Sequence, residues 1–237
     1  GQYVGQMYIA EYFTPIHDSR NSMIYISQSK RYIRKCYKEL STHFLNEVFI
    51  YTLLAKYNIV GLAPRILEVG YNTFSKIYFI TLEYLPNSYE LGRFSSDNLI
   101  DFITKANILH TLGIVHNDIK PDNLILANDN VYFIDFEFCK VSYPFSNTKG
   151  MKTLNRHTPL YAPPEKLGND ALVAFNLEYR DDIWSIGITI IEAFLGIDIF
   201  KDCTVLRQLR SAIREKITEE NLRQMIHSQE LAEIIIA

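Results

Sequence analysis

Two groups of polar side chains flank a short apolar pattern near the middle of the chain. The first group contains Asp118, Lys120 and Asn123 within six positions, and the second contains Asp135, twelve positions after Asn123. Apolar residues lie between the groups, on both sides of an Asn-Asp-Asn run that is a turn signal. The pattern predicts a hairpin that holds carboxylate and amide oxygens at its open end.

These residue types suit metal-assisted phosphoryl transfer. Proteins hold Mg²⁺ with one or two carboxylates together with phosphates of the substrate. A separate Asp can orient an attacking hydroxyl group, and a Lys can offset charge on the phosphoryl group that moves. Asp and Asn are also common in turns for backbone reasons, so the first group alone is a weak signal. Asp135 strengthens it, because a carboxylate after four apolar residues is costly unless a charged group pairs with it.

The elements that must position these residues change in type along the chain. Residues 23–26 and 31–34 flank a polar turn and predict a hairpin. Residues 44–57 have the apolar spacing of an amphipathic helix. The remaining predicted elements are a strand over residues 77–82, a break at 86–88, and helices over 99–112, 183–195 and from 205 onward. A strand-rich part followed by a helix-rich part predicts an α+β fold.

Composition excludes several classes of protein. The 237 residues are 48% hydrophobic and 22% charged, as in ordinary globular proteins of one large or two small domains. The net charge of −3 does not suggest a nucleic-acid partner, and no apolar run reaches the roughly 20 residues of a membrane helix. Three widely spaced cysteines without metal-binding spacing fit a reducing compartment, so we expect a cytoplasmic location.

The central motif H-x-D-x-K-P-x-N, followed by D-F-x, resembles the catalytic loop and magnesium-binding segment of protein kinases. The resemblance implies that Asp118 is the catalytic base and that Lys120 contacts the transferred phosphate. It also implies that Asn123 and Asp135 hold Mg²⁺, or alternatively Mn²⁺, beside ATP. A Lys two residues after the catalytic Asp is the pattern of Ser/Thr kinases.

The resemblance extends to the first part of the chain. Lys35 is similar to the strand lysine that contacts the α- and β-phosphates, and Glu47 is similar to its helical partner. The interval of 12 residues between them is short for the family. Residues 82–85 resemble the hinge that meets the adenine through backbone groups. The cofactor-binding residues implied in this way are Lys35, Glu47, Glu83, Leu85 and Ile125.

The second part of the chain resembles the family as well. Residues 158–165 resemble the end of the activation segment, in which Thr158 and Glu165 support substrate binding. Asp182 resembles the helical Asp that supports the catalytic loop, and a helix N-cap is a further role that is compatible with this one. The resemblance covers residues 20–200. It implies a two-lobed fold, with a β-rich lobe over residues 1–85 and a helical lobe over 86–237 that is short or truncated at its C-terminal end.

Three departures from the family pattern affect the expected function. No G-x-G-x-x-G occurs, and the polar residues 14–21, which predict an ordinary turn, stand in its place. Asn117 replaces the Arg that pairs with a phosphorylated activation segment, so we expect activity without that phosphorylation. Glu137 replaces the Gly of D-F-G and predicts one fixed conformation, which is either assembled or disabled.

Three functions are consistent with these features. The leading hypothesis is a divergent, compact eukaryotic-like Ser/Thr protein kinase, similar to kinases of bacterial pathogens and large viruses and acting on proteins, in which case the host cytosol is an alternative location. A second is a small-molecule kinase of the choline or aminoglycoside type, because Asn117 and Glu137 fit that group better. A third is a catalytically silent kinase-like binding protein, which the missing glycine-rich loop favours. A regulatory partner that completes the short C-terminal lobe is also expected.

Overall fold

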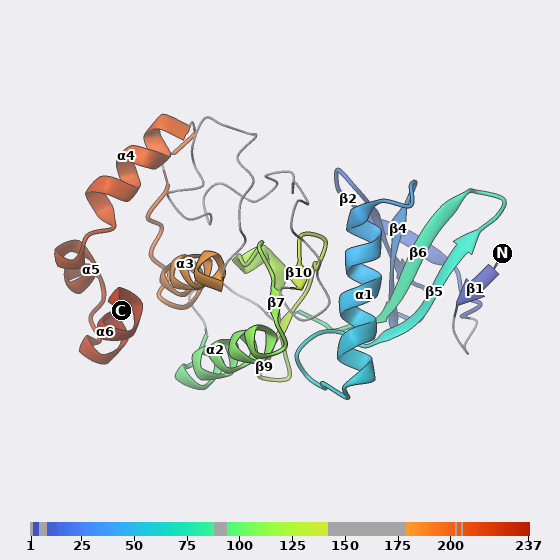
Figure 1. The fold of residues 1–237 in the computed structure, drawn as a ribbon, viewed down its shortest axis with the longest axis horizontal. Helices are drawn as coiled ribbons and strands as arrows, with labels where there is room; N and C mark the ends of the chain where they lie inside the picture. Colours follow the sequence, from blue (N-terminus) through green and yellow to red (C-terminus); the bar gives the residue numbers. More distant parts are fainter. Residues whose placement is uncertain (1, 5–8, 88–93, 142–178, 202, 205) are drawn as a thin grey trace. The chain divides into compact units, whose positions relative to one another are not determined.

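A computed structural model describes residues 2–4, 9–87, 94–141, 179–201, 203–204 and 206–237 of the chain (Figure 1). The chain divides into two compact units. Unit 1 consists of Gly1–Ser88 and Asn123–Cys139, and unit 2 consists of Tyr89–Asp122 and Lys140–Ala237. Unit 1 contains most of the strands and unit 2 most of the helices, so the chain is of the α+β class.

Unit 1 is built on an antiparallel sheet of six strands in the order β1-β5-β6-β4-β3-β2. The strands are β1 Gln2–Val4, β2 Phe13–Asp18, β3 Met23–Ser27, β4 Tyr32–Tyr37, β5 Ile66–Asn72 and β6 Ile77–Glu83. Residues 14–18 therefore belong to a strand and not to the polar turn that the sequence predicts. The reason is that β2 is an edge strand: it is largely exposed and tolerates Pro15 beside a bulge, so its sequence lacks an apolar alternation.

Helix α1, Thr42–Lys56, packs on this sheet and contacts β5 and β6 (Figure 1). Ser41 caps the helix by accepting a hydrogen bond from the N–H of Phe44. The buried face repeats at helical spacing and includes Phe44, Glu47, Ile50, Tyr51 and Leu54. Glu47 is thus a carboxylate on an otherwise apolar buried face, which requires a charged partner.

The predicted central hairpin is present. Strands β8, Leu124–Ala127, and β9, Asn130–Phe133, are antiparallel, and Asn128 and Asp129 in the turn both have positive φ. The N–H of Phe133 donates to the carbonyl of Leu62 at 2.8 Å. Such long-range bonds explain why the hairpin belongs to unit 1, which differs from a single division after residue 85.

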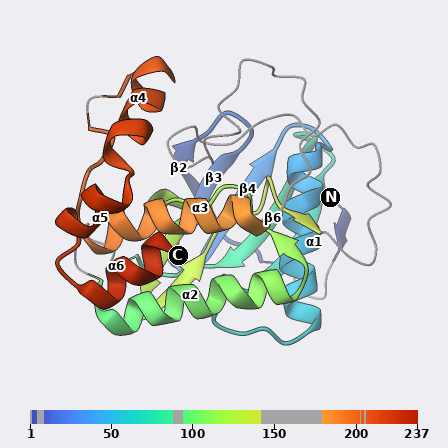
Figure 2. The same ribbon diagram turned by 60° about the vertical axis from the view of Figure 1, so that its left-hand side comes forward.

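Unit 2 is mainly helical. Its elements are α2 Ser96–Thr111, β7 Ile114–Val115, β10 Lys140–Val141, α3 Tyr179–Thr189, the π-helical turn η4 Ile190–Phe194, α4 Leu206–Lys216, α5 Glu219–Met225 and α6 Gln229–Ile236. A further 3-10 turn, η1 Pro121–Asn123, leads into β8. Figure 2 shows α2 and α3 side by side, and the rings of Phe102 and Phe194 stack at 5.5 Å. The apolar core under α4, α5 and α6 includes Ile191, Phe200 and Leu222.

The helices begin and end where the local sequence allows. A capping box between Ser95 and Asn98 begins α2, and Gly113 follows its C-terminus at φ +78°. Within the described residues, no helix has the length and apolar character needed to cross a membrane.

Candidate active site

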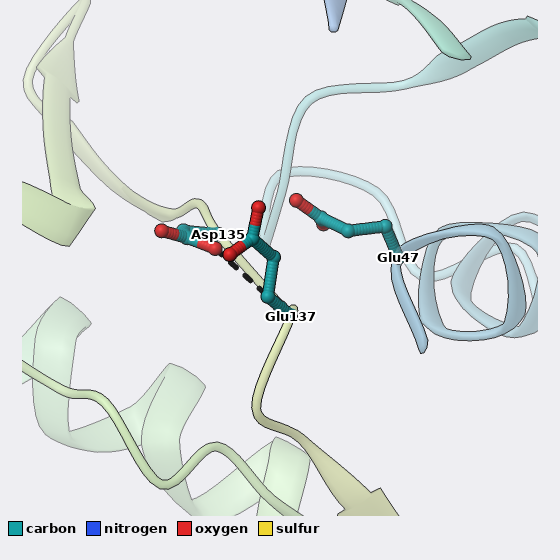
Figure 3. A group of neighbouring side chains, drawn as sticks. All are labelled: Glu47, Asp135 and Glu137. Carbon is teal, nitrogen blue, oxygen red and sulfur yellow. Dashed lines mark hydrogen bonds between the residues drawn. The ribbon is translucent and has the colours of Figure 1, made fainter. Parts of the chain in front are cut away.

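Lys35 lies on β4 and is the centre of a buried charge network in unit 1. Its ammonium group forms an ion pair with Glu47 of α1. It also lies 3.0 Å from Glu137 Oε1 and 3.4 Å from Asp135 Oδ1. Figure 3 shows the carboxylates of Glu47, Asp135 and Glu137 gathered together, and one oxygen of each lies within 4.8 Å of one oxygen of the other two. One ammonium group is therefore shared among three carboxylates.

This excess of negative charge shifts the pKa values of Lys35 and Glu47. Burial opposes the charge of Lys35, but the surrounding acidic groups, with Glu47 foremost, outweigh that effect and raise the pKa of the ammonium group well above its usual value. Burial raises the pKa of Glu47 to about 7, and Lys35 only partly opposes this shift. Lys35 consequently remains charged at neutral pH, while Glu47 is poised to take up a proton.

The segment that follows β9 is fastened to α1. The backbone N–H of Phe136 donates to Glu47 Oε2 at 3.0 Å, and the Phe136 ring packs edge-on against Tyr51 at 5.0 Å. Asn46 Nδ2 donates to the carbonyl of Glu137 at 2.7 Å. These contacts hold Asp135 beside Lys35. The sequence predicts a segment fixed in either an assembled or a disabled conformation, and within unit 1 the segment has the assembled one.

Backbone strain in this segment falls on Asp135, not on Glu137. Asp135 has φ +61°, a conformation that Asp tolerates better than most residues, and within residues 135–139 it is the one residue with positive φ. The Glu137 backbone therefore has no need of the glycine that the family usually places there.

The residues predicted to bind metal, Asn123 and Asp135, both lie at the open end of the hairpin. Asn123 is buried, and its carbonyl accepts a hydrogen bond from the N–H of Ile134 at 3.0 Å. This bond closes the hairpin one residue before Asp135, whose side chain is 28% exposed. Asn123 and Asp135 thus lie at the same end of one hydrogen-bonded hairpin.

The residues predicted at the nucleotide base are distributed over two elements of unit 1. Glu83 ends β6, where its N–H donates to the carbonyl of Arg65 at 2.9 Å. Leu85 follows β6 and is half-buried. Ile125 is a half-buried residue of β8. Their role in binding stays a prediction.

The catalytic-loop residues of unit 2 are organised by Asp182. This fully buried carboxylate accepts hydrogen bonds from the N–H groups of His116 and Asn117, both at 2.8 Å, and lies 2.9 Å from His110 Nε2. Asp182 lies within α3, Tyr179–Thr189, so the additional capping role that the sequence suggested is wrong. The Asp182 side chain instead fixes the backbone of the loop.

The loop holds two of the predicted catalytic side chains close to each other. Asp118 is buried, and Lys120 Nζ lies 4.0 Å from its Oδ2. Asn117 has φ +67°, which Asn adopts more readily than Arg, so the replacement of Arg at this position is also favourable for the backbone. Thr158 and Glu165 lie outside the described residues.

Three residues of the unit 1 network were missed by the motif analysis: Tyr37, Asn46 and Tyr51. Tyr37 lies two residues after Lys35 on a strand and therefore on the same face. Tyr51 lies four residues after Glu47 on a helix, which also places both on one face. Periodicity could have found these two, whereas Asn46 acts from the position beside Glu47 and has no such signal.

Comparisons with known proteins identify the family of this chain. The protein kinase domain model matches residues 4–235. The serine/threonine-protein kinase STE20 of Eremothecium gossypii is 37% identical over 106 residues, which are 44% of this chain and 10% of that kinase. The probable CTD kinase subunit alpha homolog of Encephalitozoon cuniculi is 29% identical over 195 residues, 76% of this chain and 55% of that protein. This chain therefore spans a tenth of the first relative and about half of the second.

A solved structure has the same fold. It is the crystal structure of the yeast RNA Pol II CTD kinase CTDK-1 complex, and the match has a TM-score of 0.67 and 16% identity. The alignment covers 98% of this chain and 88% of that one. The predicted fold class is confirmed, and the chain belongs to the protein kinase domain family, with its two-lobed α+β fold.

Proposed function

We propose that this chain transfers the γ-phosphoryl group of ATP to Ser or Thr residues of proteins. The observation that carries the proposal is the Lys35–Glu47 ion pair with Asp135 3.4 Å from the same ammonium group. Lys120, two residues after Asp118, supports Ser/Thr specificity, as does the relative named a serine/threonine-protein kinase.

The donor set of unit 1 fits a nucleotide triphosphate and a divalent cation. Lys35 keeps its positive charge and can bind phosphate oxygens. Asp135 and Asn123 offer hard oxygen ligands at one end of the hairpin, which suits Mg²⁺ and also Mn²⁺. When bound, the cation would reduce the negative charge on the phosphates.

The residues of unit 2 supply the chemistry at the acceptor. Asp118 would accept the proton of the Ser or Thr hydroxyl group as a general base. Lys120, 4.0 Å away, would offset charge on the phosphoryl group as it moves. Asp182 keeps both in place through its two bonds to the backbone of the loop.

We propose further that activity does not need phosphorylation of the activation segment. Asn117 is neutral, so it offers no guanidinium group to pair with a phosphate. The segment after β9 is already fastened to α1 by the Phe136 and Asn46 hydrogen bonds. Both features support a site whose order comes from its own contacts.

A cytoplasmic location and a regulatory partner belong to the same proposal. The three cysteines are widely spaced in sequence, which favours a reducing compartment. The solved structure with this fold is of a CTD kinase complex, which supports a regulatory partner here.

Incubation with labelled ATP, Mg²⁺ and generic protein substrates tests the proposal. We expect labelled Ser or Thr in the wild type, in the absence of any prior phosphorylation, and loss of labelling on chelation of the metal or in Asp135→Ala. Asp129→Asn, in the exposed hairpin turn, is the matched control and should label normally. Labelling of choline or aminoglycosides but not of proteins would instead support a small-molecule kinase.

A second candidate function, a catalytically silent binding protein, is favoured by the position of Glu137. Its carboxylate lies 3.0 Å from Lys35 and adds negative charge where phosphates would bind. A thermal-shift titration separates the two candidates. Nucleotide at 100 times Kd stabilises a protein by about 2.7 kcal/mol, so an active kinase should show a clear shift with millimolar Mg-ATP, and a silent binder without nucleotide affinity should show none.

A further inference from the structure

Glu137 links three elements of unit 1, although the family usually has a glycine at this position. Its side chain reaches β4, where it accepts a hydrogen bond from the Tyr37 hydroxyl at 2.9 Å and lies 3.0 Å from Lys35 Nζ. Its backbone carbonyl accepts a bond from Asn46 of α1 at 2.7 Å. We refer to Glu137, Tyr37, Lys35 and Asn46 as the Glu137 latch.

The burial of Glu137 shows that these contacts are integral to the unit. The residue is 6% exposed, and a carboxylate at this depth is stable only with charged or hydrogen-bonding partners. Lys35 and Tyr37 supply both kinds of partner from β4. A glycine at position 137 would lose both contacts and would give the backbone more conformational freedom.

Tyr37 joins the two carboxylates that flank Lys35. Its hydroxyl lies 2.9 Å from Glu137 Oε1 and 3.4 Å from Glu47 Oε1. Burial and the neighbouring Glu47 raise the pKa of Tyr37, so the hydroxyl stays neutral and remains a donor. The Tyr37 ring is fixed by edge-on packing against Phe44 at 5.4 Å. A neutral donor between two anionic groups lowers their mutual repulsion.

We propose that Glu137 and Tyr37 are positioning residues, which fasten the segment after β9 to β4 and so keep Lys35, Glu47 and Asp135 assembled. This inference rests on the proposed kinase function and adds to it a constitutive positioning device: the order that an activating event would otherwise supply is present in unit 1 from the start. The hydrogen bonds of Tyr37 and Asn46 and the ion pair with Lys35 carry the argument together.

The carboxylate of Glu137 also has a cost for nucleotide binding, because it repels phosphates that approach Lys35. The charge and the hydrogen bonds can be separated by substitution. Glu137→Gln keeps an oxygen that accepts from Tyr37 but removes the charge. Glu137→Gly removes both, and Tyr37→Phe removes one hydroxyl group alone.

The test combines hydrogen exchange of residues 136–139 with steady-state kinetics. We expect Glu137→Gly to speed exchange of the Phe136 amide and to lower kcat, each by about tenfold, as the loss of a charged hydrogen bond implies. Tyr37→Phe should give smaller changes in the same direction. Glu137→Gln should restore kcat to near the wild-type value and lower KM for ATP, a split that a purely structural residue would not show.

Glu68→Gln is the matched control. Glu68 is also a buried carboxylate paired with a cation of β4, Arg34, but it accepts its hydrogen bonds from Arg34, Thr81 and the N–H of Ile9, which lie outside the latch. We expect it to lower the melting temperature and to leave exchange at residues 136–139 and kcat unchanged.

The outcomes distinguish the latch from the proposed function. Unchanged exchange in Glu137→Gly, or an increase in kcat, would overturn the positioning role. If that variant does not fold, unchanged exchange and kcat in Tyr37→Phe would overturn it equally. Absence of turnover in the wild type would contradict the kinase proposal, whereas the exchange rates would still test whether the latch holds the segment.

Discussion

Two buried acidic centres organise this chain, and they are stabilised in different ways. In unit 2, Asp182 accepts two backbone N–H groups at 2.8 Å and lies 2.9 Å from a histidine ring. In unit 1, Lys35 is shared by Glu47, Asp135 and Glu137, so acidic groups outnumber the base. The first centre is held mainly by dipoles of the backbone, and the second by side-chain charges that a proton or a phosphate can alter.

The difference suggests that the two centres have different roles. Backbone N–H groups cannot change their charge, so the two bonds that they donate to Asp182 should hold the loop with Asp118 in one arrangement when nucleotide binds. The Lys35 centre must instead exchange one set of anionic partners for another when nucleotide binds, and an excess of carboxylates of adjustable protonation allows this. Perturbation of the two centres should therefore have different consequences.

The largest loss of stability is expected from Asp182→Ala. It removes the acceptor of two buried backbone N–H groups, which costs roughly 2–6 kcal/mol at about 1–3 kcal/mol for each group. Urea unfolding measures this loss. Asp182→Asn, which keeps one acceptor oxygen, should lose clearly less. Equal unfolding midpoints for Asp182→Ala and the wild type would show that the carboxylate does not hold the loop.

Lys35→Met should lower the free energy of unfolding less at low pH than at high pH, because the carboxylates of unit 1 can take up protons and so reduce their mutual repulsion. At pH 8 we expect a loss of roughly 3 kcal/mol, typical of breaking a buried ion pair. Near pH 5 the loss should be smaller. Adding Glu47→Gln to Lys35→Met should recover part of the loss at pH 8, and simple additivity of the two substitutions would contradict a shared network.

The raised pKa of Glu47 predicts a smaller, pH-dependent change in stability. A carboxyl group with a raised pKa binds its proton more tightly in the folded state, so its contribution is fully present below pH 4.5 and is lost as pH rises to about 7. Relative to Glu47→Gln, the wild type should therefore lose up to roughly 1 kcal/mol of stability per pH unit across this window. Unfolding free energies measured from pH 4.5 to 8 test the slope, and parallel curves for the two proteins would count against the shift.

The smallest loss of stability is expected from Asn117→Arg in unit 2. Because residue 117 has φ +67°, the substitution should cost about 1 kcal/mol through backbone strain alone. A melting temperature lower by a few degrees would show this. Asn107→Arg on the exposed face of α2 is the control and should be neutral. A neutral Asn117→Arg would mean that the loop backbone tolerates Arg equally well.

Much of the fold could be predicted because the signals are local. The hairpin of β8 and β9 has both its apolar runs and its turn residues in one stretch of sequence, and α1 has a clear helical period. β2 was missed because an exposed edge strand has no apolar alternation to detect. The grouping of the hairpin with unit 1 depends on hydrogen bonds to distant residues such as Leu62, which sequence spacing does not reveal.

The candidate site shows the same division between local and long-range information. Motif order was enough to predict Lys35, Glu47, Asp118 and Asp182, because each lies in a recognisable local pattern. The consequence of Glu137 could not be predicted, since it depends on Tyr37 and Asn46 reaching the residue from 100 and 91 positions away. Sequence could only show that the glycine was absent.

The rate of phosphoryl transfer from labelled ATP to protein by Asp118→Asn, compared with the wild type, tests the central claim most directly. The variant keeps the size of the side chain and lacks the general base, so we predict a fall in kcat of roughly 10²–10⁴-fold with an unchanged unfolding transition. Turnover at the wild-type rate in a folded Asp118→Asn protein would contradict the account.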